Sequence, residues 1–170
     1  MIRGSHKRSD CMNQGTSVRF RVIVFALTAG MIAFAFIHSA MPASESSKES
    51  NSVLAFLSAL LSGLGIHREL TGLFVRKLAH FSEYTVIGTL LVSCAYSFDR
   101  ARPYRYLAAV LFTGLVSALT DETIQLFSEG RAGQITDVWL DFSGVLTGTA
   151  LMLLFFVLYI RIKKRKRGRE

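Results

Sequence analysis

The sequence predicts an all-α fold: a polytopic membrane helical bundle with four transmembrane helices and a short interfacial helix in the first extracytoplasmic loop. Hydrophobic residues make up 51% of the 170 residues, and charged residues only 19%. The apolar residues stand in long uncharged blocks, at 22–37 and 145–160, rather than at the spacing of a soluble domain. With two Pro, two Cys and 13 Phe, the composition excludes a disordered chain, a collagen and a disulfide scaffold.

Four segments are long enough to cross a bilayer, which requires about 20 largely apolar residues. They are residues 20–41, 78–98, 104–127 and 137–160. Pro42 ends the first span, because proline cannot continue a helix. The sequence DRARP separates the second and third spans, and SEGRAGQ, with two glycines suited to a turn, separates the third and fourth. The first span could instead be a cleaved signal peptide, since basic residues precede it and small residues follow it.

The distribution of basic residues predicts that both termini are cytoplasmic. Fifteen of the 20 Lys and Arg residues lie in the N-terminal segment, in the loop after the second span and in the C-terminal tail. Cytoplasmic loops carry such an excess. The chain therefore divides into a basic arm (1–19), a transmembrane domain (20–160) and a basic tail (161–170). The tail is predicted to fix the topology and to meet anionic lipid, so the net charge of +8 does not indicate nucleic acid.

The first extracytoplasmic loop is predicted to contain a short helix. Residues 44–52 are serine-rich and read as a solvated stretch. Apolar residues then recur at helical spacing over residues 53–64. Twelve residues cannot cross about 30 Å of hydrocarbon, so this helix either lies in the outer interface or packs over the bundle.

The two cysteines are predicted to remain unpaired. Cys11 lies in the cytoplasmic arm and Cys94 in the inner half of the second span, so neither faces an oxidising compartment. Met12 offers an alternative start of the chain to Met1.

Polar residues gather at the predicted outer ends of three spans. The second span opens with RKLAHFSEY, the third ends with TDETIQLF, and the fourth opens with DVWLDFSGVLTG. Within each segment the polar residues are spaced three, four or seven residues apart and therefore share a helix face. Charges in lipid cost about 2.5–3.5 kcal/mol each at a helix centre, so they face inward. The predicted ligand-binding residues are Lys77, His80, Tyr84, Asp121, Glu122, Gln125, Arg131, Asp137 and Asp141.

A purely structural role is the alternative for the same residues. Gly144 and Gly148 form a small-xxx-small pattern that lets two helices approach closely. An ion pair from Lys77 or Arg131 to an aspartate could hold the bundle together without any ligand. The shared depth of the three polar segments favours a single site over separate local pairings.

These motifs resemble the VanZ-like family, small bacterial membrane proteins named after a teicoplanin-resistance protein. The resemblance covers residues 36–157 and rests on three blocks in order. The matching residues are Lys77, His80, Phe81, Tyr84, Ile87 and Gly88; Asp121, Glu122, Gln125 and Phe127; and Gly130, Arg131, Asp137, Asp141, Gly144 and Gly148. The chain departs at Ile124, where many members carry His, and at Glu129, where many carry Pro. The resemblance implies a multi-pass protein of a bacterial cell membrane that lowers susceptibility to teicoplanin.

Three functions are compatible with these residues. In a binding protein, Lys77, His80 and Arg131 would meet the phosphate or carboxylate of a membrane lipid, a lipid-linked cell-wall precursor or a glycopeptide. In a hydrolase or transferase acting on a lipid-linked substrate, His80 or Glu122 would be the general base. A scaffold would bind no ligand.

No cofactor and no metal is predicted, because no close-spaced His and Cys residues indicate zinc. A mixed set of nitrogen and oxygen ligands from His80, Glu83, Glu122 and Asp137 is the variant left open.

Overall fold

The computed structural model describes residues 16–65 and 70–167, and within these residues it contains helices and no strand. The helices are α1 (Val18–Ala40), α2 (Ala43–Gly63), α3 (Gly72–Phe98), the 3-10 helix η1 (Pro103–Tyr106), α4 (Leu107–Gln125) and α5 (Ile135–Arg167). The predictions for Cys11 and Met12 lie outside the described residues, as do most of the basic arm and the last residues of the tail.

Four helices are long and apolar enough to cross a membrane, which confirms the predicted fold class. The spans are Val18–Ala40, Gly72–Phe98, Pro103–Gln125 and Ile135–Ile162. The second span begins six residues before its predicted start at Leu78, because the Thr71 hydroxyl caps the helix by accepting a hydrogen bond from the Phe74 amide (3.2 Å). The third helix ends at Gln125, two residues before its predicted end, and α5 extends beyond the predicted fourth span at both ends.

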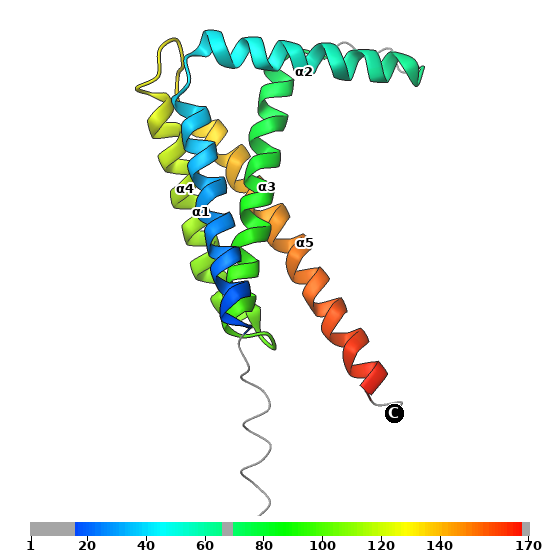
Figure 1. Ribbon diagram of the computed structural model, residues 1–170. Helices are drawn as coiled ribbons and strands as arrows, with labels where there is room; N and C mark the ends of the chain where they lie inside the picture. The colour runs from blue at the N-terminus through cyan, green and yellow to red at the C-terminus, as the bar shows by residue number, and fades with distance from the viewer. Residues whose placement is uncertain (1–15, 66–69, 168–170) are drawn as a thin grey trace, which may run out of the picture.

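The bundle is built around the crossing of α3 and α5. Helices α1, α3 and α4 run side by side, and α5 crosses them and then diverges toward its C-terminal end (Figure 1). A Cβ atom on Gly144 would lie 2.6 Å from the Phe81 carbonyl oxygen, and one on Gly148 would collide with the Thr85 carbonyl oxygen. The predicted small-residue pattern is therefore a close backbone contact between two helices.

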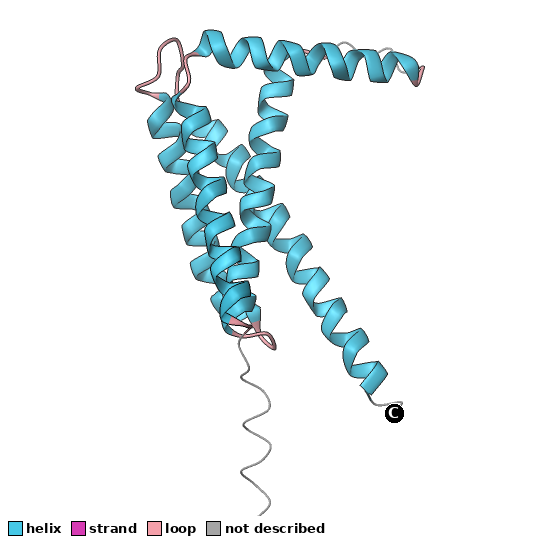
Figure 2. Cartoon of the chain, in the orientation of Figure 1, coloured by secondary structure: helices cyan, strands magenta, loops and turns pink. Residues whose placement is uncertain are grey.

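Helix α2 lies across one end of the bundle, nearly at right angles to α3 (Figure 2). The predicted helix of this loop is present but begins earlier than expected, because one 21-residue helix also includes the serine-rich stretch at 44–52. Most residues of that stretch are exposed, as predicted. Tertiary contacts hold the serine-rich turns in place. The Ala43 amide donates to the Glu129 carbonyl oxygen (2.9 Å), and Ser46 is buried.

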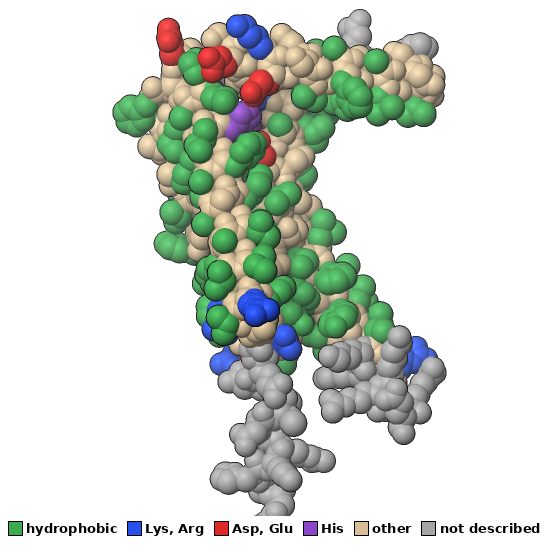
Figure 3. Space-filling view, viewed as in Figure 1, with side chains coloured by type: hydrophobic (Ala, Val, Ile, Leu, Met, Phe, Trp, Pro, Cys, Tyr) green, Lys and Arg blue, Asp and Glu red, His purple; other side chains and the backbone are tan. Residues whose placement is uncertain are grey.

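The two ends of the bundle differ in chemistry. We call the end crossed by α2 the α2 end; α1 begins and α5 finishes at the opposite, terminal end (Figure 1). Exposed apolar side chains cover the flanks and the underside of α2, with Lys and Arg at the terminal end (Figure 3). An amphipathic helix perpendicular to the spans has the geometry of a helix in the membrane interface.

Candidate functional site

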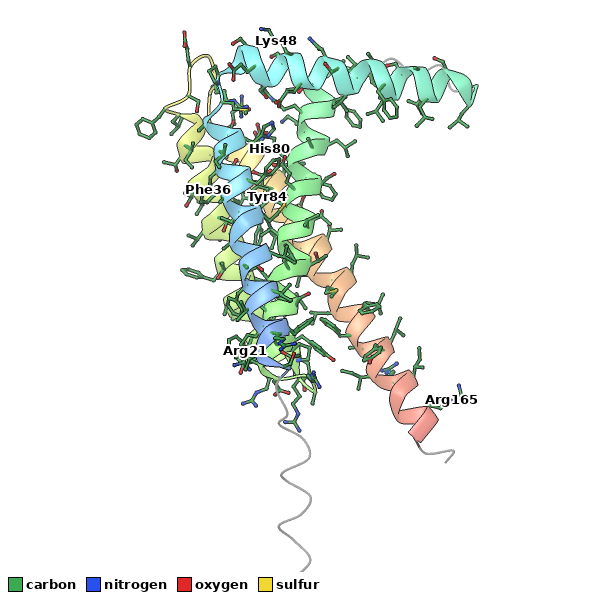
Figure 4. All side chains as sticks on the ribbon, viewed as in Figure 1. Arg21, Phe36, Lys48, His80, Tyr84 and Arg165 are labelled. Atoms are coloured by element: carbon green, nitrogen blue, oxygen red, sulfur yellow. The ribbon has the colours of Figure 1, made fainter. Side chains whose placement is uncertain are left out.

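Three helices bring their ionisable side chains together beneath α2. His80 of α3 lies with its Nδ1 atom 3.8 Å from Asp121 Oδ2 of α4 and 3.9 Å from Asp141 Oδ1 of α5. All three side chains are buried, and both aspartates are fully shielded from solvent. Figure 4 shows His80 and Tyr84 on the stretch of α3 that faces into the bundle. We refer to His80, Asp121 and Asp141 as the buried triad.

A hydrogen-bond network surrounds the Asp121 carboxylate. The Ser39 hydroxyl of α1 donates to Asp121 Oδ2 (2.6 Å), and Gln125 Nε2 donates to the same oxygen (3.3 Å) and to Glu122 Oε1 (2.9 Å). The second oxygen of Glu122 accepts the backbone amide of Gln134 (2.9 Å). Glu122 and Gln125 thus connect the triad to the loop between α4 and α5.

Two basic side chains lie at the rim. Lys77 donates to Asp137 Oδ1 (2.6 Å) and so joins α3 to the first turn of α5. Arg131 donates from Nη2 to the His38 carbonyl oxygen (3.2 Å), while its Nε and Nη1 atoms are buried without a hydrogen-bond partner. Burial lowers the pKa of the Arg131 guanidinium, although arginine stays charged in proteins. Arg131 is therefore a fixed cation with unused donors.

Tyr84 connects α3 to α4 next to the triad. It is fully buried, and its hydroxyl donates to the Ser117 carbonyl oxygen (3.2 Å). It therefore ties α3 to α4 beneath the triad.

The first span adds two residues that the sequence reasoning did not select. Ser39 reaches Asp121, and His38 Nε2 lies 3.1 Å from Glu49 Oε2 of α2. His38 Nδ1 is 3.5 Å from Glu83 Oε1, and the His38 and His80 rings lie 6.0 Å apart between centroids. Their position in the sequence could have identified both as candidates, because they stand just before Pro42, at the outer end of the first predicted span, where the other polar residues also lie.

A comparison with protein families identifies the family of this chain. The model of the VanZ/LLP1 family matches residues 23–157. The chain belongs to the VanZ/LLP1 family. Neither the curated proteins nor the solved structures gave a match. The VanZ/LLP1 match includes the buried triad, its hydrogen-bond network, both rim cations and His38.

Two cavities adjoin this VanZ/LLP1 site. A small one of about 10 Å³, close to the space of one water molecule, lies against the triad. It is lined by Arg76, Lys77, His80, Glu122, Gln125, Asp137, Leu140 and Asp141. A groove of about 290 Å³ lies in the angle between α2 and α3, and His38 and Glu49 form its polar end. Val53, Leu57, Val75 and Leu78 give the groove most of its apolar lining, and Ser50 and Ser82 add two hydroxyl groups.

The predicted candidates fall into distinct groups. His80, Asp121 and Asp141 meet directly, with Glu122 and Gln125 next to them. The rim contains Lys77, Asp137 and Arg131. Tyr84 is buried and connects α3 to α4 through its hydrogen bond to Ser117. The mixed ligand set with Glu83, Glu122 and Asp137 does not assemble around His80. Within the described residues, His80, Asp121 and Asp141 form the group whose possible ligand atoms all lie within 4.8 Å of one another.

Proposed function

We propose that this VanZ-like membrane protein binds the headgroup of an envelope lipid, such as a lipid-linked cell-wall precursor, at the extracytoplasmic face of a bacterial membrane. The observation that carries the proposal is the amphipathic groove between α2 and α3, which ends beside the polar cluster. A contribution to teicoplanin resistance would follow if the bound molecule is the precursor that the drug targets.

The groove has the right chemistry for the boundary between headgroup and acyl chain. Its apolar wall is made by Val53 and Leu57 of α2 and Leu78 of α3, and its polar end by His38 and Glu49. An interfacial helix such as α2 lies near the boundary between headgroups and acyl chains. A lipid lying in the groove would therefore place its headgroup against the polar end.

The rim cations support an anionic headgroup. Arg131 has two buried nitrogen atoms without a hydrogen-bond partner, and Arg76 and Lys77 line the small cavity next to the triad. Hydrogen bonds from arginine or lysine to phosphate are about twice as strong as neutral ones. A phosphate or pyrophosphate bound here would use the two Arg131 donors that have no partner and would lie close to the positive charges of Arg76 and Lys77.

Binding to a fluorescent lipid-linked cell-wall precursor in nanodiscs tests this function. Arg131→Gln should weaken binding about 10- to 100-fold, because a hydrogen bond to a charged group contributes about 1.5–3 kcal/mol. Arg105→Gln at the terminal end is the matched control, since Arg105 is largely exposed and far from the groove. Equal affinity of wild type and Arg131→Gln would contradict a role for this cation in headgroup binding.

A second candidate is a membrane hydrolase or transferase that acts on a lipid-linked substrate. The position of His80 between two carboxylates favours it, because neighbouring carboxylates can orient an imidazole that takes up a proton. His80→Gln keeps an amide donor and acceptor but cannot act as a base at neutral pH.

Teicoplanin susceptibility of cells that carry the variants separates the two functions. A binding protein should keep part of its effect in His80→Gln and lose it in His80→Ala. An enzyme with His80 as base should lose it equally in both. Immunoblots of the membrane fraction provide the control for protein level.

A further inference from the structure

We propose that the buried triad binds one divalent transition-metal ion, such as Zn²⁺ or Mn²⁺, between α3, α4 and α5. The proposal goes beyond lipid binding and rests on side chains that do not line the groove. It explains why one imidazole and two carboxylates from three helices meet in the interior of the bundle.

The spacing of the ligand atoms is close to that of a metal centre. Bonds from zinc to nitrogen or oxygen are about 2.0–2.2 Å, so two ligand atoms of one ion lie no more than about 4.4 Å apart. His80 Nδ1 is 3.8 Å from Asp121 Oδ2 and 3.9 Å from Asp141 Oδ1, and the three possible ligand atoms lie within 4.8 Å of one another. A shift of well under 1 Å would bring all three onto a shared ion.

The hydrogen bonding of the two aspartates points to a cation. Asp141 is fully buried, and both its carboxylate oxygens lack a hydrogen-bond partner, as does Asp121 Oδ1. Buried carboxylates are normally paired, protonated or bound to a metal. Within the described residues, neither rim cation forms an ion pair with Asp121 or Asp141. Lys77 pairs with Asp137, and Arg131 donates to the His38 carbonyl oxygen.

The surroundings resemble the outer shell of a metal site. Carboxylates that ligate metals are themselves held by hydrogen bonds, and the Ser39 hydroxyl holds Asp121 in this way (2.6 Å). The cavity of about 10 Å³ beside His80 and Asp141 has room for one water molecule, which could complete the coordination. Imidazole together with carboxylate suits Zn²⁺, Mn²⁺ or Fe²⁺ better than Ca²⁺, which prefers oxygen ligands alone.

The experiment uses the full-length protein, purified in detergent, stripped with a chelator and freed of lipid. Titration with ZnCl₂, MnCl₂ and CoCl₂ is followed by calorimetry, by metal content after desalting and by the visible absorption of bound Co²⁺. We expect one ion per chain and a higher Tm with metal. Asp141→Asn and Asp121→Asn should lose more than the 10- to 100-fold in affinity that loss of an outer-shell partner costs, and Ser39→Ala should lose about 10- to 100-fold.

Asp137→Asn is the matched control, because it removes a neighbouring carboxylate of α5 that pairs with Lys77 outside the triad. It should keep the metal. Binding of none of the three ions by the wild type, or equal affinity in Asp141→Asn and wild type, would overturn the proposal. Two triad variants are used so that the test remains valid if one of them misfolds, and size-exclusion profiles show which variants are folded. Because no lipid is present, the result is independent of the outcome of the precursor-binding test.

Discussion

At the scale of single residues, Asp121 depends on Ser39, a neighbour from another helix. The Ser39 hydroxyl gives Asp121 Oδ2 its short hydrogen bond, whereas Gln125 contacts the same oxygen at 3.3 Å. Periodicity and depth along the spans placed His80, Asp121 and Asp141 at one level of the bundle, but together with six other candidates and without singling out these three. They could not assign their partners: Glu83 lies beside His38, and Tyr84 donates to a backbone carbonyl. Such pairings depend on helix rotation and packing, which a single sequence does not specify.

Ser39→Ala should lower the stability of the protein. Removing one partner of a buried hydrogen bond costs about 1–3 kcal/mol, because the other partner stays desolvated. The measurement is thermal unfolding of the purified protein in detergent, in the presence of a chelator. Ser82→Ala is the control, since the exposed Ser82 hydroxyl only donates to Leu78 O of its own helix. An equal change in both variants would mean that the contact between Ser39 and Asp121 contributes nothing.

At the scale of the elements, glycines determine the close contact between α3 and α5. The length of α2 depends instead on its contacts with the rest of the chain. The glycine spacing in the fourth span predicted a close helix contact. The partner helix came only from the structure. The length of α2 was not predictable in the same way, because residues 44–52 have no apolar periodicity. Their helix is held by the hydrogen bond from Ala43 to Glu129, which is distant in the sequence, and by the contact of His38 with Glu49, which joins α1 to α2.

Gly148→Ala should separate α3 and α5 and destabilise the bundle. The added Cβ collides with the backbone at Thr85, which cannot move as a flexible side chain could. Overpacking of this kind costs about 1–3 kcal/mol. Gly30→Ala is the matched control, because a Cβ at this position of α1 meets nothing within 4 Å. Thermal unfolding and yield in the membrane fraction are the readouts. A Gly148→Ala protein as stable as Gly30→Ala would contradict the close packing.

At the scale of the whole molecule, the two ends of the bundle carry different polar groups. The buried triad, its hydrogen-bond network and the rim cations lie at the α2 end, and Arg21 and Arg165 mark the terminal end (Figure 4). Four spans could be predicted from block length alone, because spanning the bilayer requires a continuous apolar helix. The proposed orientation, with the terminal end in the cytoplasm, rests on the excess of Lys and Arg there.

The orientation can be tested by cysteine labelling in intact cells. In a background in which Cys11 and Cys94 are replaced, Ser47→Cys and Glu129→Cys should react with an impermeant maleimide, since both residues are exposed at the α2 end. Ala101→Cys, which is exposed in the loop after α3, should react only after the cells are permeabilised. Labelling of Ala101→Cys from outside would reverse the topology and place the polar cluster in the cytoplasmic leaflet. Such a result would overturn the proposed binding of an outer-leaflet lipid, but it would leave the metal proposal intact, because the triad does not depend on which side it faces.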